Sequence, residues 1–248
     1  INIDNIYSKK RILNDQKVSL LKLKTIDIDL IKSELNKSKK PILWLGNGLR
    51  GMDSNELRNI ILKLNIPYLT SWTANDLFNH IEKLYAGHAG TYGSRVGNLM
   101  LQSADFVLTL GTRLAIPQKG YLDEELAREA KIFVVDIDKQ ELDKLGARFN
   151  NKFQYDAKLF LKTVSENSKD IKKNFDYWEN HLNKLKKIYP NLENCHRKNN
   201  SGEFINSYSF ISKLGSMAPS NTTFVTDMGT ALISGFQILD PKYGQKLF

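Results

Sequence analysis

The feature that most constrains the fold is a regular alternation of short apolar runs with segments of helical periodicity. The runs are apolar on both faces, and glycine or polar residues bound them. Strands of this kind, alternating with helices, are typical of a parallel sheet covered by helices. The sequence therefore predicts an α/β fold built on a doubly wound parallel sheet. The predicted strands cover residues 42–45, 66–70, 106–110 and 132–135, with a candidate fifth at residues 152–155.

Helices are predicted between these strands, because apolar residues recur there every three or four positions. Asp53 or Ser54 stands at the N-cap of one predicted helix, and Asp156 stands at the N-cap of another. The longest apolar stripe ends at Pro190, which cannot continue a helix. The predicted helices cover residues 26–35, 53–64, 95–103, 122–130, 157–164 and 170–189.

The chain divides into a large central unit and a short second unit. We expect residues 1–25 to be a linker from a missing N-terminal domain, residues 26–168 to be a central Rossmann-like domain, and residues 169–206 to be a linker helix and connector. Residues 207–248 indicate the start of an incomplete second α/β domain, which is too short to bury a core of its own. This unit is either docked on the first or truncated. The lack of an initiator methionine also predicts a natural start upstream.

The composition is that of a soluble globular protein, with 41% hydrophobic and 25% charged residues. The formal net charge is +9, but the lysines are scattered, so we expect a lysine-rich surface and no nucleic-acid partner. No apolar run approaches the roughly 20 residues of a membrane-spanning helix, so no membrane partner is expected. The single cysteine, Cys195, excludes an internal disulfide and fits a cytoplasmic location.

Short polar or glycine-rich segments follow the predicted strands, at the edge where parallel sheets bind ligands. The first, Gly46-Asn-Gly-Leu-Arg-Gly51, is a G-x-G-x-x-G string between a strand and a capped helix. Such a string lets backbone N–H groups approach a phosphate, or it only packs strand against helix, and both interpretations remain open. Thr70 or Ser71 stands where NAD-binding folds place an acidic residue, and Asp76 lies further on, which argues against ordinary NAD binding.

His88 lies in a glycine-rich loop that we expect to be flexible. Its small neighbours would let the ring reach a ligand, although a lone histidine more often has a structural role. No second histidine, cysteine or carboxylate pair stands nearby at metal-ligand spacing, so no metal site is predicted. The other histidines are interpreted as surface residues: His80, His181 and His196.

Asp136 and Asp138 lie at the end of a predicted strand. Asp136 is a candidate acceptor for ribose hydroxyl groups, whereas Asp138 is placed to cap the segment that follows. Two carboxylates could also do acid–base work, but no nucleophile–base set, P-loop or paired cysteine motif accompanies them. The residues therefore predict a chain that binds a phosphorylated ligand, and no catalytic residue is assigned.

Five segments in order resemble one family, the thiamine-diphosphate-dependent decarboxylases and carboligases, with acetolactate synthase and its relatives the most similar members. Single segments of this kind are weakly specific, but their order and spacing agree over most of the chain, from residue 38 to residue 248. The segments are KPILWLGNG at 40–48, AGHAGTYGSR at 86–95, ADFVLTLGTRL at 104–114, VDIDKQEL at 135–142 and TDMG at 226–229.

The resemblance implies a Rossmann-like central domain, which in acetolactate synthase holds FAD in a structural role. It also implies thiamine diphosphate contacts at the start of the second unit. The implied nucleotide positions are Gly46, Gly48, His88, Gly111, Arg113, Asp136 and Asp156, and the implied thiamine diphosphate positions are Gly229, Thr230 and Ala231.

The chain departs from the family pattern at three places. Ala89 occupies the usual histidine position, one place after His88. The uncharged segment 114–117 replaces charged residues that follow the arginine in FAD-binding members, so FAD is in question and we expect the protein not to be yellow. Thr230 and Ala231 replace the Gln-His pair of FAD-type synthases, which predicts that those side-chain contacts are lost or replaced.

The resemblance implies that the complete protein decarboxylates a 2-keto acid on thiamine diphosphate and transfers the acyl unit to a second carbonyl compound. It further implies Mg²⁺ as a cofactor and a homo-oligomer as the assembled enzyme. The activating glutamate and the metal-binding loop of the family fall outside these 248 residues, so we expect the chain alone to be inactive. The alternative is a non-catalytic nucleotide-binding or assembly module.

Overall fold

The computed structural model describes residues 25–78, 80–81, 83–171, 174–193, 204–242 and 244–248. Nearly all of the linker expected at residues 1–25 lies outside these ranges, as do Cys195 and His196.

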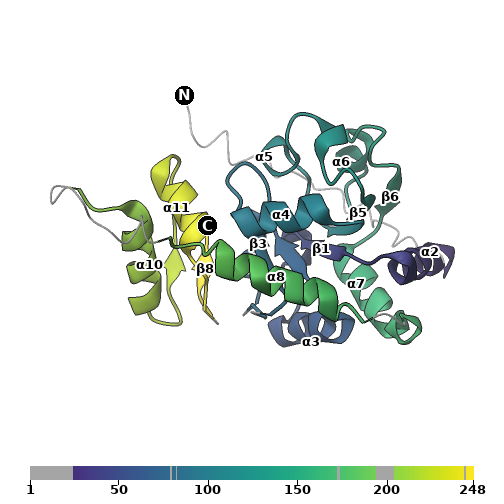
Figure 1. Cartoon of the computed structure of the whole chain (residues 1–248), viewed down its shortest axis with the longest axis horizontal. Coiled ribbons are helices and arrows are strands. Elements are labelled where there is room, and N and C mark those ends of the chain that lie inside the picture. The colour runs from purple at the N-terminus through teal and green to yellow at the C-terminus, as the bar shows by residue number, and fades with distance from the viewer. Residues whose placement is uncertain (1–24, 79, 82, 172–173, 194–203, 243) are drawn as a thin grey trace, which may run out of the picture.

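The largest unit is a six-stranded sheet (Figure 1). Its strands are β1 (Pro41–Leu45), β2 (Tyr68–Thr70), β3 (Tyr85–His88), β4 (Phe106–Leu110), β5 (Lys131–Asp136) and β6 (Asn151–Gln154). They lie in the order β3-β2-β1-β4-β5-β6, and every neighbouring pair is parallel. The predicted doubly wound parallel sheet is therefore confirmed.

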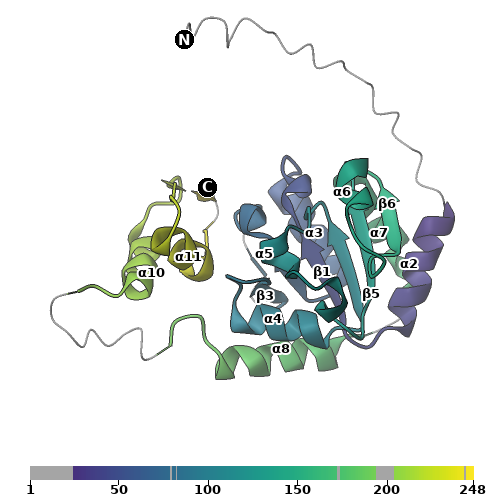
Figure 2. The same ribbon diagram turned by 90° about the horizontal axis from the view of Figure 1, so that it is seen from above.

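Helices cover both faces of this sheet (Figure 2). They are α2 (Thr25–Lys37), α3 (Ser54–Leu64), α4 (Arg95–Ser103), α5 (Ile116–Lys119), α6 (Lys139–Asp143), α7 (Ala157–Glu166) and α8 (Asp176–Ile188). The chain moves from β1 outward to β3 and then returns past β1 to β4. Because crossovers between parallel strands are right-handed, this reversal places α3 and α4 on opposite faces. α7 packs with α3, and α8 packs with α4.

The strand near His88 differs from the sequence prediction of a flexible loop. Tyr85 and His88 pair with the edge of β2, so this segment becomes the outermost strand of the sheet, β3. Its two middle residues, Ala86 and Gly87, give no apolar run from which a strand could be predicted. Pairing with β2, rather than local propensity, makes this strand.

Two predicted helices are shorter in the structure. Residues 122–130 hold only a 3-10 turn at Asp123–Glu125, and Ala127 then takes a left-handed backbone with φ of 43° that ends helical geometry. The helix predicted at residues 170–189 begins only at Asp176.

Helix α8 is fixed to the sheet by buried aromatic side chains. Phe175, Trp178 and Leu182 are buried. Trp178 Nε1 donates a hydrogen bond to the carbonyl of Pro41 at 2.9 Å. The helix is therefore tied directly to the first residue of β1.

Replacing Trp178 with phenylalanine tests this tie. We expect Trp178→Phe to lower the free energy of unfolding by about 2 kcal/mol, because the Pro41 carbonyl loses its donor and a small void remains. Urea unfolding measures the change. Tyr177→Phe is the matched control, because the Tyr177 side chain is exposed, and it should change stability little. Equal losses in the two variants would contradict the role of the buried indole.

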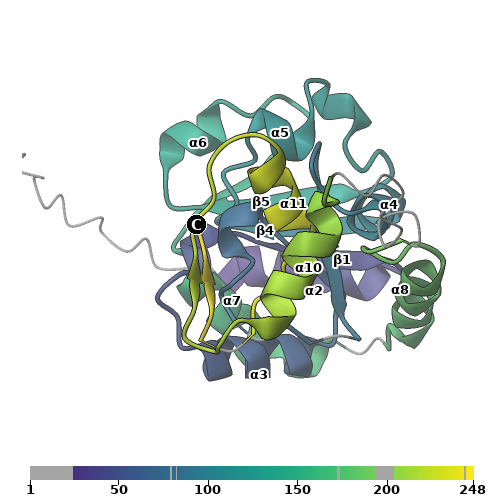
Figure 3. The same ribbon diagram turned by 90° about the vertical axis from the view of Figure 1, so that its left-hand side faces the viewer.

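A smaller unit at the C-terminus contacts the large one and lies in front of its sheet in Figure 3. It consists of α10 (Ser207–Met217), β7 (Thr223–Phe224), α11 (Thr230–Ile238) and β8 (Lys246–Leu247), and its two strands are parallel. Phe236, Leu239 and Leu247 form its small buried cluster, against which Trp72 of the large unit packs. None of the helices in the described ranges is both long and apolar enough to cross a membrane.

An ion pair between Arg50 and Asp76 helps to fasten this unit. Arg50 Nη2 lies 2.6 Å from Asp76 Oδ1, and the backbone N–H of Leu247 donates to Asp76 Oδ2 at 3.2 Å. The guanidinium also lies over the ring of Phe248, 5.7 Å from its centroid. The Asp76 side chain is 1% exposed, so it is committed to this contact and not to a ribose.

Candidate functional site

A crevice opens at the carboxyl ends of the central strands, where β1 and β4 lie side by side and the chain leaves in opposite directions. Ligands bind at this position in doubly wound sheets. The crevice encloses a cavity of about 590 Å³. It is lined by Asn47, Gly48, Thr73, Gly111, Thr112, Arg113, Asp136, Ile137, Asp138, Glu141, Asp156 and Ala157.

The crevice brings together five of the residues that the sequence assigned to a nucleotide: Gly48, Gly111, Arg113, Asp136 and Asp156. Gly46 lies beside it without lining it, and His88 lies elsewhere. Sequence reasoning missed four lining residues with polar side chains: Asn47, Thr73, Thr112 and Glu141. Thr112 stands between two assigned residues, and Glu141 follows Asp138 by three positions, so helical spacing could have indicated it.

The glycines of the turn after β1 pack against the turn after β4. A side chain at Gly46 would place its Cβ 2.1 Å from the Gly111 carbonyl oxygen, and one at Gly48 would place it 2.8 Å from Gly111 Cα. The N–H of Gly46 donates to the Leu110 carbonyl, and the N–H of Gly48 donates to the Gly111 carbonyl. These two glycines therefore serve the contact between the turns, and their N–H groups do not face a ligand.

Aspartate side chains cap the N-termini of three helices that begin at the carboxyl edge of the sheet. The Asp53 carboxylate accepts hydrogen bonds from the first turn of α3, and Asp138 and Asp156 do the same for α6 and α7. A carboxylate satisfies the free N–H groups there and supplies the negative charge that the helix dipole favours. The caps predicted at these three positions are confirmed.

The turn that carries Arg113 holds a strained backbone. Arg113 and Leu114 take left-handed conformations in succession, with φ of 61° and 46°. Each such residue costs about 1 kcal/mol when it is not glycine. Arg113 Nε lies 3.1 Å from Glu141 Oε1, and Lys144 also pairs with Glu141. The strain places the guanidinium at the rim of the crevice and the Leu114 side chain in the core.

Relieving this strain should stabilise the protein. We expect Arg113→Gly to raise the free energy of unfolding by about 0.5–1 kcal/mol, because glycine adopts the left-handed conformation freely and the lost ion pair is exposed. Urea unfolding measures the difference. Arg128→Gly is the control, since Arg128 also makes an exposed ion pair but has no positive φ, and it should not stabilise. A loss of stability in Arg113→Gly would refute the strain argument.

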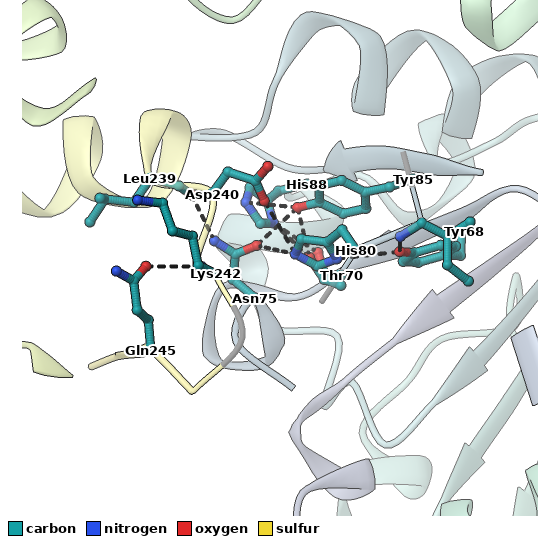
Figure 4. Close-up of polar contacts among 11 residues, drawn as sticks. Tyr68, Thr70, Asn75, His80, Tyr85, His88, Leu239, Asp240, Lys242 and Gln245 are labelled. Atoms are coloured by element: carbon teal, nitrogen blue, oxygen red, sulfur yellow. Dashed lines mark hydrogen bonds and ion pairs between the residues drawn. The ribbon is translucent and has the colours of Figure 1, made fainter. Parts of the chain in front are cut away.

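A second cluster surrounds His88 on the β3 side of the sheet (Figure 4). Asn75 is its centre and is 1% exposed. Asn75 Oδ1 accepts from His80 Nε2 at 3.1 Å and from the Tyr85 hydroxyl at 3.0 Å. Asn75 Nδ2 donates to the carbonyl of Leu239 at 3.1 Å, which links the cluster to the C-terminal unit.

The hydrogen bonds of Asn75 fix the protons of His80 and Tyr85. Since His80 Nε2 carries a proton, His80 Nδ1 accepts from the Tyr68 hydroxyl at 3.3 Å. The Tyr85 hydroxyl proton is used on Asn75, and His88 Nε2 lies 3.3 Å from the Tyr85 oxygen. His88 Nδ1 lies 2.9 Å from Thr70 Oγ1 and 3.4 Å from the Thr70 carbonyl oxygen. Both imidazoles are therefore neutral links in one chain.

Burial explains the charge state of this cluster. It lowers the pKa of His80 to about 3 and the pKa of His88 to about 4, and it raises the pKa of Tyr85 well above its usual value. The sequence interpretation of His80 as a surface residue is wrong. Its side chain is 4% exposed, and its ring stacks on Tyr85 with 3.7 Å between centroids. The polar residues next to His80 in the sequence predict an exposed position, so its burial could not be read from the local pattern.

The cluster forms one wall of a separate cavity of about 420 Å³. Lys186 of α8 and Asp240 after α11 also line it. His88 therefore faces this cavity and not the crevice. Its ring nitrogens are both used by neighbouring side chains, so the position supports structure at the junction of the two units.

The glycine turn before α11 lies apart from both cavities. Gly229 has a φ of 89°, and a Cβ there would meet no atom within 4 Å. Among the described residues no side chain caps the N-terminus of α11, where Thr230 and Ala231 are exposed. Within the described residues, no group of three or more His, Cys, Asp or Glu side chains could hold a metal ion.

Comparison with known proteins identifies relatives. Residues 28–164 match the family described as "Thiamine pyrophosphate enzyme, central domain". The acetolactate synthase large subunit of Cyanidium caldarium is 28% identical over 232 residues, which are 89% of this chain and 37% of that protein. The probable acetolactate synthase large subunit of Methanococcus aeolicus is 30% identical over 161 residues, 60% of this chain and 26% of that protein. The chloroplastic acetolactate synthase 2 of Nicotiana tabacum is 30% identical over 160 residues, 63% of this chain and 24% of that protein.

The chain thus spans well under half of the length of these relatives. The family match runs from α2 to α7, so it contains the six-stranded sheet and the crevice, and it covers more than half of the 248 residues. The chain therefore belongs to the thiamine pyrophosphate enzyme family. Acetolactate synthases are among its relatives in that family.

Proposed function

We propose that this chain is part of an enzyme that decarboxylates a 2-keto acid and transfers the acyl unit to a second carbonyl compound, as the names of its acetolactate synthase relatives suggest. In this proposal residues 26–168 are the central domain, residues 169–206 connect, and residues 207–248 begin the domain that binds thiamine diphosphate. Mg²⁺, a homo-oligomeric state and a cytoplasmic location belong to the same proposal, as does inactivity of the 248 residues alone.

The observation that carries this proposal is the open N-terminus of α11. Gly229 leaves free space where a side chain would lie, and no side chain in the part of the chain that the structure describes caps the helix. A helix N-terminus of this kind favours an anion, because its N–H groups lack partners and its dipole is positive there. The residues therefore fit a diphosphate, held by the backbone of Gly229, Thr230 and Ala231. Thiamine diphosphate, when bound, supplies the electron sink for the chemistry.

A pair of glycine substitutions tests this site. We expect Gly229→Val, in the complete protein, to weaken thiamine diphosphate binding at least tenfold, since the side chain would fill the space of the phosphates. Gly120→Val is the matched control. Gly120 has a similar φ of 83° and equally open surroundings. Valine there therefore brings the same backbone strain without changing the N-terminus of α11.

Calorimetric titration with thiamine diphosphate and Mg²⁺ gives the affinities, and urea unfolding gives the stabilities. The proposal expects both variants to lose similar stability and only Gly229→Val to lose affinity. Unchanged affinity in folded Gly229→Val would show that the glycine only permits a tight turn.

A further inference from the structure

The loops on either side of β3 hold the last turn of α11. Asn75 Nδ2 donates to the Leu239 carbonyl at 3.1 Å, as Figure 4 shows. Gln237 Nε2 donates to a carbonyl of the loop before α4 at 3.4 Å. The ring centroids of Trp72 and Phe236 lie 6.1 Å apart. Together with the contacts of Asp76 described above, these ties attach the C-terminal unit to the large one.

Two buried histidines lie at this attachment. His80 and His88 line the cavity of about 420 Å³, and residues 237–240 of the C-terminal unit line another part of its wall. His80 Nε2 is 4.0 Å from a carboxylate oxygen of Asp240. If the C-terminal unit moves away, this part of the wall is removed and water reaches both imidazoles. The surroundings of the two histidines therefore depend on docking.

The C-terminal unit has few buried contacts of its own. Within the described ranges its buried apolar cluster consists of Phe236, Leu239 and Leu247, and α10 contributes no buried residue. Its sheet has two strands of two residues each. Regions with so little buried apolar surface open at a lower free energy than the core of a sheet. The unit can therefore separate while the six strands of the large sheet stay paired.

The hydrogen bonds of His80 leave no acceptor for a second proton. His80 Nε2 donates to Asn75 Oδ1 at 3.1 Å, and His80 Nδ1 accepts from the Tyr68 hydroxyl at 3.3 Å. The Tyr68 oxygen already accepts from the N–H of Ile81 at 3.0 Å. A proton on His80 Nδ1 would thus leave the Tyr68 hydroxyl proton without an acceptor among the described residues. Protonation is therefore incompatible with the docked hydrogen bonds.

The charged and titratable neighbours do not compensate for such a proton. The groups that act on the two imidazoles, or on their tyrosine partners, from neighbouring elements are Tyr68 of β2, Tyr85 of β3, Lys186 of α8, Asp240 after α11 and Arg58 of α3. Lys186 opposes a proton on His80, as does His88. The tyrosines stay uncharged, because burial raises the pKa of their hydroxyl groups. Asp240 is 77% exposed, so water screens its attraction.

We propose that His80 and His88 form an acid-sensitive latch between the two units. With neutral imidazoles the cluster holds the last turn of α11. Proton uptake by the imidazoles releases the C-terminal unit, while the six-stranded sheet stays folded. The released state binds protons that the docked state excludes, because its imidazoles face water. The latch does not depend on thiamine chemistry.

The pH window of the latch follows from these two states. Burial lowers the pKa of His80 to about 3 and the pKa of His88 to about 4 in the docked state. Water returns both to a pKa of about 6.5 in the released state. Docking is therefore strongest above about pH 6.5 and weakens as the pH falls towards about 4. Between about pH 7.5 and about pH 5, the ratio of released to docked molecules rises up to about thirtyfold for each histidine that reaches water.

Amide hydrogen exchange of the 248-residue chain tests the latch in the wild type. Protection of α11 and of β4 is measured at about pH 7.5 and about pH 5 in several low concentrations of urea, and corrected for the intrinsic exchange rate at each pH. We expect the protection of α11 to be at least about thirtyfold lower at the acidic pH. It should also fall less steeply with urea than the protection of β4, because release exposes less surface than global unfolding.

Two outcomes of this measurement would overturn the latch. Unchanged protection of α11 at the acidic pH would show that docking does not respond to protons. Equal protection and equal urea slopes in α11 and β4 would show that the C-terminal unit opens only when the whole chain unfolds.

Glutamine variants assign the effect to the two histidines. Glutamine keeps a side-chain donor and acceptor but does not titrate. We expect His80→Gln and His88→Gln each to reduce the pH dependence of α11 protection at least about threefold, since each removes one of the two protons. His181→Gln is the matched control, because His181 stacks on Trp178 and does not line the cavity. An unchanged pH dependence in both test variants, or an equal reduction in all three, would overturn the role of the two histidines.

Discussion

Lowering the pH from about 7.5 to about 5 is expected to reduce the free energy of unfolding by about 4 kcal/mol, about 2 kcal/mol for each of two buried histidines. Burial lowers the pKa of His80 to about 3 and the pKa of His88 to about 4. In the unfolded chain both return to a pKa of about 6.5. Between these values the unfolded chain binds protons that the folded chain does not, so stability falls as the pH falls below 6.5.

The charged groups around the cluster do not reverse this sign. Lys186 opposes a proton on His80. Asp240 lies 4.0 Å from His80 Nε2 but is 77% exposed, so water screens its attraction. The loss of stability should level off only below the folded pKa values of the two histidines.

Urea unfolding at both pH values measures the effect. We expect His80→Gln and His88→Gln each to remove about half of the difference between the two pH values. His181→Gln is the control, because His181 is only partly buried on α8 and should leave the difference intact. An unchanged pH dependence in both test variants would contradict the assignment of the effect to this cluster.

Replacing Asn75 with alanine is expected to cost about 3–4 kcal/mol of stability, because it leaves two buried groups without a partner and takes one acceptor from a third. The two groups are His80 Nε2–H and the Leu239 carbonyl. The third is the Tyr85 hydroxyl, which keeps its contacts with Thr70 and His88. The cost of an unpaired buried polar group exceeds the net value of the hydrogen bond itself, which makes the central member of a network the most sensitive position.

Urea unfolding gives the cost, and hydrogen exchange in α11 reports on the docking of the C-terminal unit. We expect α11 to exchange faster in Asn75→Ala, since the link to Leu239 is lost. Asn59→Ala is the control, because Asn59 is exposed on α3 and should change stability by less than about 0.5 kcal/mol. A cost below about 1 kcal/mol for Asn75→Ala would argue against the proposed proton arrangement.

Local patterns predicted the central part of the fold well. The strand at 106–110 and the helix at 95–103 have the same bounds in sequence and structure, because a continuous apolar run and a capped apolar stripe define them. The edge strand at Tyr85–His88 was missed because its pairing with β2 decides its conformation. The apolar pattern predicts a helix over residues 122–130, where the structure has a 3-10 turn at Asp123–Glu125, because this pattern does not report the positive φ of Ala127.

The sequence predicted many of the residues that line the candidate site. It did not predict which of their polar atoms form hydrogen bonds within the protein. Segments at the ends of strands can be expected to meet, and Gly48, Gly111 and Asp136 do so. The contact between the turn of Gly46 and the turn of Gly111 spans a large sequence separation, so sequence reasoning left open whether the glycines face a phosphate or pack. Asn75 was missed entirely, because its partners include Leu239 in the other unit.

The aspartate caps also bear on how the protein matures in the cell. In many nucleotide-binding folds the ligand itself completes the hydrogen bonds of a helix N-terminus, so synthesis without ligand leaves that part unfinished. Here Asp53, Asp138 and Asp156 complete these bonds from within the chain. The first turns of α3, α6 and α7 can therefore complete their hydrogen bonds during folding before any ligand arrives.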